Sequence, residues 1–153
     1  MKASKDTLKE YKKLRNFSKT PEPKGKVRRT SKTRFVIHEH HASHLHWDLR
    51  LEMEGVLKSW AVPKGPPERP GIKRLAVQTE DHPVDYIDFE GLIPEGHYGA
   101  GMVKIWDNGP FELLEMKKER EIKFSLAGKR LKGTYYLLKF REGRNWLFFR
   151  GKE

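Results

Sequence analysis

The stretch Leu45-His46-Trp47-Asp48-Leu49-Arg50-Leu51-Glu52-Met53 decides the fold class, because apolar and polar residues alternate along it. An alternation with a period of two predicts a β-strand, since successive side chains of a strand point to opposite faces. We expect the apolar face to pack into a core. The opposite face then carries four polar side chains in a row, those of His46, Asp48, Arg50 and Glu52.

Shorter runs of the same kind lie on both sides of this stretch. A β pattern starts at Arg34 and recurs over residues 56–62, 72–78, 102–106, 111–115, 122–126, 134–140 and 146–149. Glu54-Gly55 predicts a turn, and Asn108-Gly109 predicts a hairpin between two of these strands. Many short strands with regular turns predict a mostly β fold, either a compact closed or nearly closed β-barrel or a sandwich.

The first 33 residues have a different character, being basic and poor in large apolar side chains. Leu8, Tyr11 and Leu14 recur at helical spacing and predict a short helix over residues 6–14. Prolines at positions 21 and 23 end any helix and indicate an extended arm. We therefore divide the chain into residues 1–33, a basic N-terminal arm with a short helix, and residues 34–153, a β-barrel domain.

The composition limits the class of protein. A chain of 153 residues is long enough for one domain with one core. It has no cysteine, which excludes a disulfide framework and a thiolate metal site. No apolar run is long enough to span a membrane. We expect an intracellular, cytoplasmic protein that is monomeric.

The charge indicates the partner. The formal net charge is +11 and the sequence pI is about 9.8. Such an excess of Lys and Arg favours nucleic acid, because bound cations displace counterions from phosphates. A solubilising surface rich in Lys and Glu, as in heat-adapted proteins, is the alternative interpretation. A membrane surface is disfavoured, since no basic amphipathic helix with a strong apolar face is visible.

Five of the seven histidines lie between positions 38 and 46. His46 and Asp48 share one strand face, and another histidine upstream could complete a site of two imidazoles and one carboxylate. Such ligands suit Mn²⁺, Zn²⁺ or Fe²⁺. Arg50, next in the row, could hold a phosphate beside the metal. A cupin-like dioxygenase site would use similar ligands, and His38 or His41 alone could be an ordinary surface histidine.

Longer motifs extend this interpretation. The run from Phe35 to Glu52, FVIHEHHASHLHWDLRLE, is followed by GVLKSWAVPKGP over residues 55–66. Further segments are KRLAV at 73–77, EDHP at 80–83, Tyr86, FEG at 89–91 and IPEG at 93–96. Together these resemble the 3′-phosphoesterase domain of bacterial DNA ligase D, over roughly residues 11–150. Because no polymerase or ligase domain accompanies it, we expect a free-standing member.

The resemblance implies an activity. It implies a β-barrel hydrolase that heals the 3′ ends of DNA or RNA primer strands, in DNA end repair by non-homologous end joining. The implied cofactor is Mn²⁺, with Co²⁺ or Zn²⁺ as possible substitutes. A phosphodiesterase step removes a 3′-terminal ribonucleoside, and a phosphomonoesterase step then removes the 3′-phosphate. The implied partners are nucleic acid 3′ ends in a primer–template and a separate DNA ligase and polymerase.

The resemblance also implies residue roles. The metal ligands fall on His40, His46 and Asp48. The phosphate-binding and transition-state residues fall on Arg50, His82 and Tyr86, with support from Glu52, Glu80, Arg74 and Lys64. Arm residues of the diesterase step fall on Arg15, Asn16 and Glu22. Histidine titrates near neutral pH, so His82 is the expected general acid.

Two departures and two alternatives accompany these assignments. Asn16 stands where the family usually has Asp, and His44 stands where an Arg is common. One alternative is a nucleic-acid-binding barrel that holds a metal without catalysis. The other is a phosphatase for small phosphate esters, which the basic charge and the arm disfavour. The glycines between 96 and 101 fit either a phosphate cradle or a tight loop.

Overall fold

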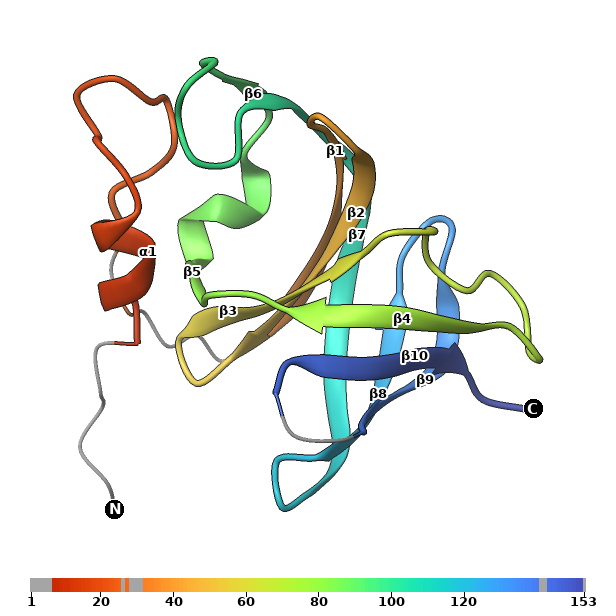
Figure 1. The fold of residues 1–153 in the computed structure, drawn as a ribbon. Helices are drawn as coiled ribbons and strands as arrows, with labels where there is room; N and C mark the ends of the chain where they lie inside the picture. Colours follow the sequence, from red (N-terminus) through yellow and green to blue (C-terminus); the bar gives the residue numbers. More distant parts are fainter. Residues whose placement is uncertain (1–6, 26, 28–31, 141–142, 153) are drawn as a thin grey trace.

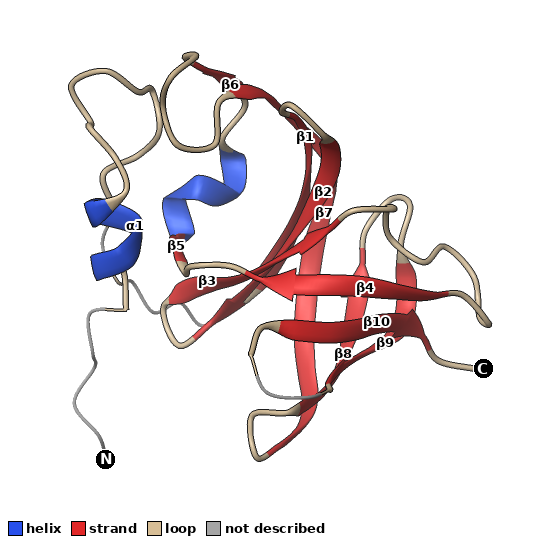
Figure 2. Ribbon diagram, in the orientation of Figure 1, coloured by secondary structure: helices blue, strands red, loops and turns tan. Residues whose placement is uncertain are grey.

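The computed structural model describes residues 7–25, 27, 32–140 and 143–152, and strands dominate it (Figures 1 and 2). The helical elements are α1 (Lys9–Lys13) and the 3₁₀ helix η1 (Val84–Asp88). The strands are β1 (Arg34–His41), β2 (Leu45–Met53), β3 (Val56–Val62), β4 (Lys73–Gln78), β5 (His82–Pro83), β6 (Gly91–Ile93), β7 (Gly101–Lys117), β8 (Glu121–Ala127), β9 (Lys132–Lys139) and β10 (Asn145–Arg150). Among these residues, no helix is long and apolar enough to cross a membrane.

Eight of the strands form a closed antiparallel barrel, which confirms the predicted fold class. Their order is β1-β2-β3-β4-β10-β9-β8-β7, and pairing between β1 and β7 closes the ring. Closure leaves no open sheet edge in the ring. Two short strands lie outside it, with β5 paired to β3 and β6 paired to β7.

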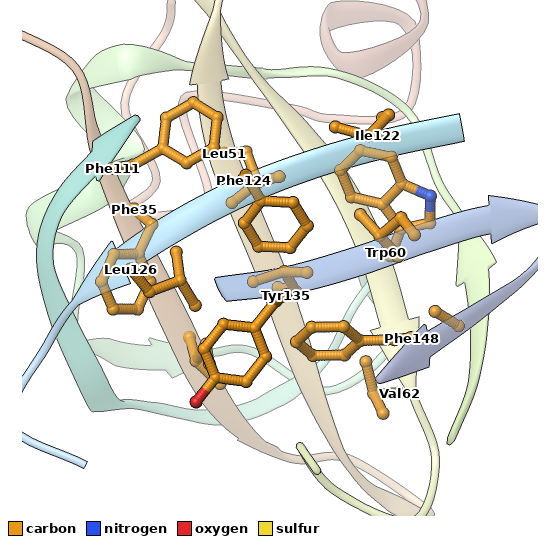
Figure 3. Packing of buried hydrophobic residues seen from close by; sticks show 14 of the residues in the cluster. Phe35, Leu51, Trp60, Val62, Phe111, Ile122, Phe124, Leu126, Tyr135 and Phe148 are labelled. Atoms are coloured by element: carbon orange, nitrogen blue, oxygen red, sulfur yellow. The ribbon is translucent and has the colours of Figure 1, made fainter. Parts of the chain in front are cut away.

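The barrel interior is filled by apolar side chains from its strands (Figure 3). Leu49, Leu51 and Met53 come from the predicted apolar face of β2. Phe124 and Phe148 are fully buried, and their rings stack 6.2 Å apart. Each large side chain buried in this way contributes roughly 1.5–3 kcal/mol of transfer free energy. This core fixes β2, and with it the opposite face of the same strand.

A second apolar cluster lies outside the barrel, beneath the N-terminal arm. Leu8 and Tyr11 of the arm pack there with Tyr86 and Ile87 of η1 and with residues of β1 and β3. Figure 1 shows α1 beside η1, on the side of the barrel where β5 lies. The polar face of β2 is therefore covered rather than open to solvent, and Asp48, Arg50 and Glu52 are all buried.

The arm helix is shorter than the sequence predicted. It covers Lys9–Lys13, with Leu14 at its C-terminal end, whereas the periodicity suggested residues 6–14. Position 6 lies outside the described residues. Five residues are too few for a helix that is stable alone, so packing of Leu8 and Tyr11 must hold it in place.

The hairpin predicted at Asn108-Gly109 does not form, and the prediction was wrong. Strand β7 runs without interruption through both residues and pairs with β1 there, Asn108 opposite Val36 and Gly109 opposite Phe35. A side chain at Gly109 would place its Cβ 2.4 Å from the carbonyl oxygen of Ala127. The glycine therefore allows a close backbone approach rather than a turn.

Candidate metal and phosphate site

Three potential metal ligands meet at the end of the β1–β2 hairpin. His40 and His46 lie opposite each other in the register of the two strands, and Asp48 follows two residues along β2. The ligand atoms of these three side chains lie within 4.8 Å of one another. The Asp48 carboxylate is 3.6 Å from His40 Nδ1 and 3.3 Å from His46 Nε2. The structure thus brings together all three predicted ligands.

Backbone carbonyls orient both imidazoles toward Asp48. His40 Nε2 is 2.8 Å from the carbonyl oxygen of Gly99, and His46 Nδ1 is 3.1 Å from that of His44. When these nitrogens donate to the carbonyls, His40 Nδ1 and His46 Nε2 are free to bind a cation. Fixed tautomers of this kind are typical of metal-ligating histidines.

Asp48 is ionised despite its burial. Burial alone would raise the pKa of its carboxyl group, but the charge of Arg50, foremost among the groups around it, outweighs this effect. The pKa of Asp48 is thereby held well below its usual value. Two imidazoles and one ionised carboxylate fit a divalent transition metal.

Arg50 follows Asp48 on the same face of β2 and connects the metal ligands to the rest of the site. Its guanidinium donates from Nη2 to Asp48 Oδ2 at 3.4 Å and from Nε to His38 Nδ1 at 3.1 Å. It also lies 5.0 Å from the centre of the Tyr86 ring. A buried guanidinium held in one place is suited to bind a phosphoryl oxygen.

His82 lies between two guanidinium groups. Its Nδ1 is 2.9 Å from the carbonyl oxygen of Glu80 and 3.1 Å from Arg50 Nη1, and its Nε2 is 3.3 Å from Arg15 Nη2. The tautomer with the proton on Nδ1 donates to Glu80 and accepts from Arg15. Burial, followed by the charges of Arg50 and Arg15, holds the pKa of His82 well below 6.5. The imidazole is therefore neutral until a ligand offsets these charges.

The arm supplies a buried network to the same site. Arg15 binds Glu22 at 2.9 Å and Glu80 at 3.1 Å. The hydroxyl of Tyr86 donates to Glu22 Oε2 at 2.7 Å. Burial raises the pKa of Tyr86 well above 10, with Glu22 adding to the shift, so the phenol keeps its proton. The charged and hydroxyl groups of arm and barrel thus satisfy one another.

A pocket of about 480 Å³ joins these groups. Arg15, Arg50, Glu80, His82 and Tyr86 line it together with the three ligands. Glu22 lies behind this wall and reaches it through Arg15 and Tyr86. The pocket thus places a cluster that could hold a cation beside groups that could bind an anion.

Besides Glu22, four residues that the sequence indicated do not line this pocket: Asn16, Glu52, Lys64 and Arg74. Glu52 accepts a hydrogen bond from the backbone of Arg34 at 3.0 Å, toward the other end of β2. Asn16 accepts hydrogen bonds from Ser18 within an exposed turn. Lys64 is exposed after β3, and Arg74 is partly buried on β4. Their assigned roles in binding or catalysis remain predictions.

The structure adds residues to which the sequence assigned no role in the site, and it shows that His38 is not the surface histidine that the sequence allowed. His38 is fully buried and accepts from Arg50, and strand periodicity from His40 would have placed it on the same face. Tyr11 lies with its ring 5.1 Å from that of His82. His97 and Tyr98 line the pocket from the loop between β6 and β7. No local pattern marks these loop residues.

Fold and site together define a class: an eight-stranded barrel with a His-His-Asp cluster and buried arginines in one pocket. Residues 38–139 match the family described as the DNA ligase D 3′-phosphoesterase domain. This chain belongs to that family, as its sequence motifs suggested.

Known relatives support the assignment. The multifunctional non-homologous end joining protein LigD of Pseudomonas aeruginosa is 50% identical over 143 residues, which cover 89% of this chain and 17% of that protein. The corresponding protein of Mycolicibacterium smegmatis is 46% identical over 97% of this chain and 21% of its own length. That of Mycobacterium tuberculosis is 45% identical over 96% of this chain and 20% of its own length. The chain thus spans about a fifth of these relatives.

Proposed function

We propose that this chain is a metal-dependent phosphoesterase that heals 3′ ends. It removes a 3′-terminal ribonucleoside from a DNA or RNA primer strand and then removes the remaining 3′-phosphate. The observation that carries the proposal is the single pocket in which His40, His46 and Asp48 adjoin Arg50 and His82. Family membership supports the same class of reaction.

Mn²⁺ is the proposed cofactor, held by His40, His46 and Asp48. Two imidazoles beside one carboxylate suit Mn²⁺, Co²⁺ or Zn²⁺, whereas Mg²⁺ prefers oxygen ligands. When bound, the metal supplies a Lewis acid for a phosphoryl oxygen and lowers the pKa of a coordinated water.

Arg50 holds the phosphoryl group and offsets its charge in both steps, and Arg15 of the arm assists it in nucleoside removal. Both guanidinium groups are buried among protein partners, so they are oriented before the substrate arrives. The negative charge of the substrate reduces the positive field on His82, which raises the pKa of this imidazole toward the range of a general acid. His82 can then protonate the leaving oxygen.

Both steps are hydrolyses of one P–O bond. In the first step a water oxygen bonds to phosphorus, the bond to the 5′ oxygen of the terminal nucleoside breaks, and that oxygen takes a proton. In the second step the bond between phosphorus and the 3′ oxygen breaks, inorganic phosphate leaves, and a 3′-hydroxyl remains. Stabilising charge at phosphorus serves both steps, whereas positioning the longer substrate serves only the first.

The proposed partners follow from charge and family. A net charge of +11 suits a nucleic acid strand, in the form of a primer–template end. The relatives are named for non-homologous end joining, so a DNA ligase and a polymerase are the proposed protein partners in DNA end repair. We propose that the protein is cytoplasmic and acts as a monomer.

A labelled primer–template tests the proposal. The primer carries a 5′ label and one 3′-terminal ribonucleotide, and its products are resolved after incubation with EDTA, Mn²⁺ or Mg²⁺. We expect a 3′-phosphate product followed by a 3′-hydroxyl product with Mn²⁺, less of both with Mg²⁺, and neither with EDTA. Binding of the primer–template without any cleavage in Mn²⁺ would favour the non-catalytic binding barrel. Cleavage of small phosphate esters alone would favour a general phosphatase.

A further inference from the structure

The pocket has a second wall that phosphate chemistry does not explain. It is lined by the buried side chains of Ile93 and Val103 and by the loop that joins β6 to β7. The cavity of about 480 Å³ is much larger than a phosphoryl group needs. An apolar wall in an otherwise charged pocket indicates a ligand that has an apolar part.

Tyr98 is the most exposed large hydrophobic side chain among the residues that line this pocket, with 48% of its surface accessible. Its hydroxyl donates to Glu80 Oε1 at 3.3 Å, and the guanidinium of Arg15 lies 5.3 Å from the centre of its ring. The ring is therefore anchored at its hydroxyl end and beside Arg15. About half of the surface of Tyr98 remains available to a ligand.

The neighbouring residue connects this loop to the metal ligands. The carbonyl oxygen of Gly99 lies 2.8 Å from His40 Nε2, so the backbone next to Tyr98 is fixed relative to the His-His-Asp cluster. Gly99 has φ +76°, a conformation that favours glycine. Tyr98 is thus held at a set position with respect to both the proposed metal and Arg15.

We propose that Tyr98 and the apolar wall beside it form a nucleobase subsite for the terminal ribonucleoside, with Tyr98 stacking on the base. The inference rests on the proposed function. A phosphorus atom held by Arg50 and His82 leaves the nucleoside on one side of it, and a half-exposed aromatic ring in the pocket lining is suited to a planar base. Aromatic stacking accepts any base, because each base presents a π face. The subsite therefore recognises that a base is present rather than which base it is.

The subsite is used in only one of the two steps. After the terminal nucleoside has left, the 3′-phosphate substrate has no base on that side of phosphorus. Tyr98 should therefore contribute to nucleoside removal and not to phosphate removal. This distinguishes it from Arg50 and His82, which face the phosphoryl group in both steps.

Three primers test the subsite with the Mn²⁺-loaded protein. The first ends in a normal ribonucleotide, the second ends in a ribose that lacks its base but is joined by the same phosphodiester, and the third ends in a 3′-phosphate. For Tyr98→Ala, we expect kcat/KM on the normal ribonucleotide to fall about tenfold, mostly through KM, as for loss of one base-stacking aromatic. The abasic and 3′-phosphate primers should be processed as by the unmodified protein. Tyr98→Phe keeps the ring but lacks the hydroxyl, so it should retain the preference for a base.

Leu114→Ala is the matched control, because Leu114 is a similarly exposed hydrophobic residue, 44% accessible, that does not line the pocket. Equal losses on all three primers for Tyr98→Ala would overturn the subsite and leave Tyr98 as a positioning residue for Glu80 and Arg15. Unchanged kinetics on the normal ribonucleotide would overturn it as well. If the unmodified protein cleaves none of the primers, the proposed function itself has failed, an outcome that these substrates separate from failure of the subsite alone.

Discussion

The two faces of strand β2 use the same backbone for opposite purposes. One face sends Leu49, Leu51 and Met53 into the barrel core, where the neighbours are apolar. The other face sends Asp48 and Arg50 into a region where charged groups are buried against one another and against the arm. The first face is stabilised by its own packing. The buried charges of the second face are tolerated because residues from elsewhere in the chain pair with them. Mutations on the first face should therefore lower stability, whereas mutations on the second face should mainly lower activity.

The largest expected effect lies on the apolar side. Phe124→Ala removes a fully buried ring that contacts the rings of Phe111, Tyr135 and Phe148. We expect a loss of about 3–5 kcal/mol in the free energy of unfolding, measured by urea denaturation. Leu114→Ala, at an exposed position, should change it by less than about 0.5 kcal/mol. A Phe124→Ala protein as stable as that control would contradict the assignment of the core.

The next largest effect lies on the polar side and concerns activity. His46→Ala should lower turnover in both steps by more than about 100-fold, since loss of even an outer partner of a metal ligand costs 10–100-fold. The free energy of unfolding in EDTA should change little, because the His46 side chain is partly exposed. His44→Ala is the matched control, since its backbone carbonyl still faces His46 Nδ1. Retention of Mn²⁺ affinity by His46→Ala, measured by calorimetry, would remove His46 from the ligand set.

The sequence predicted the two faces unequally. Alternation along β2 was enough to separate the core face from the polar face, because strand geometry has a fixed period. The pairing of His40 with His46 depends on strand register, which residue types alone did not specify. The covering of the polar face depends on Arg15, which meets Glu80 from 65 residues away. No local pattern encodes such a contact, and the family resemblance assigned roles to both residues without indicating that they meet.

The hairpin error has the same origin. Asn108-Gly109 has favourable chemistry for a turn, yet β7 continues because β1 and β8 pair with its two halves. Tertiary pairing therefore overrides a local preference. Glu52 lies in the same alternating row as Asp48 and Arg50, but it receives the backbone N–H of Arg34. The supporting role that the family resemblance implies for Glu52 remains a prediction.

A smaller effect tests the arm that covers the polar face. Glu22→Gln keeps the size of the side chain but removes the negative charge of the carboxylate, which pairs with Arg15 and accepts a hydrogen bond from Tyr86. We expect about tenfold slower nucleoside removal, as for misplacement of a positioning group, with much less change in 3′-phosphate removal. Glu10→Gln is the control, because Glu10 is exposed and lies 3.9 Å from Arg144. Equal losses in both steps would place Glu22 in the machinery that they share.

The smallest effect concerns the pH dependence of stability. His38 is buried on the polar side, where burial and then the charge of Arg50 lower its pKa from 6.5 to about 3. Between pH 6.5 and pH 3, His38 is therefore protonated in the unfolded chain and neutral in the folded chain. This contribution to stability is fully present above pH 6.5 and is lost as the pH falls toward 3.

His38→Asn tests this assignment, because an amide oxygen can still accept from Arg50 but does not titrate. Between about pH 6.5 and pH 5, the free energy of unfolding of the unmodified protein should fall by up to about 1.4 kcal/mol per pH unit more than that of the variant. Urea denaturation in EDTA measures the difference without a metal contribution. His41→Asn is the control for loss of an imidazole at an exposed position of the same strand. Parallel pH profiles for the unmodified protein and His38→Asn would show that His38 is not held neutral by the buried face. The evidence that the polar side of β2 differs from the apolar side would then come only from the arm residues and the arginines.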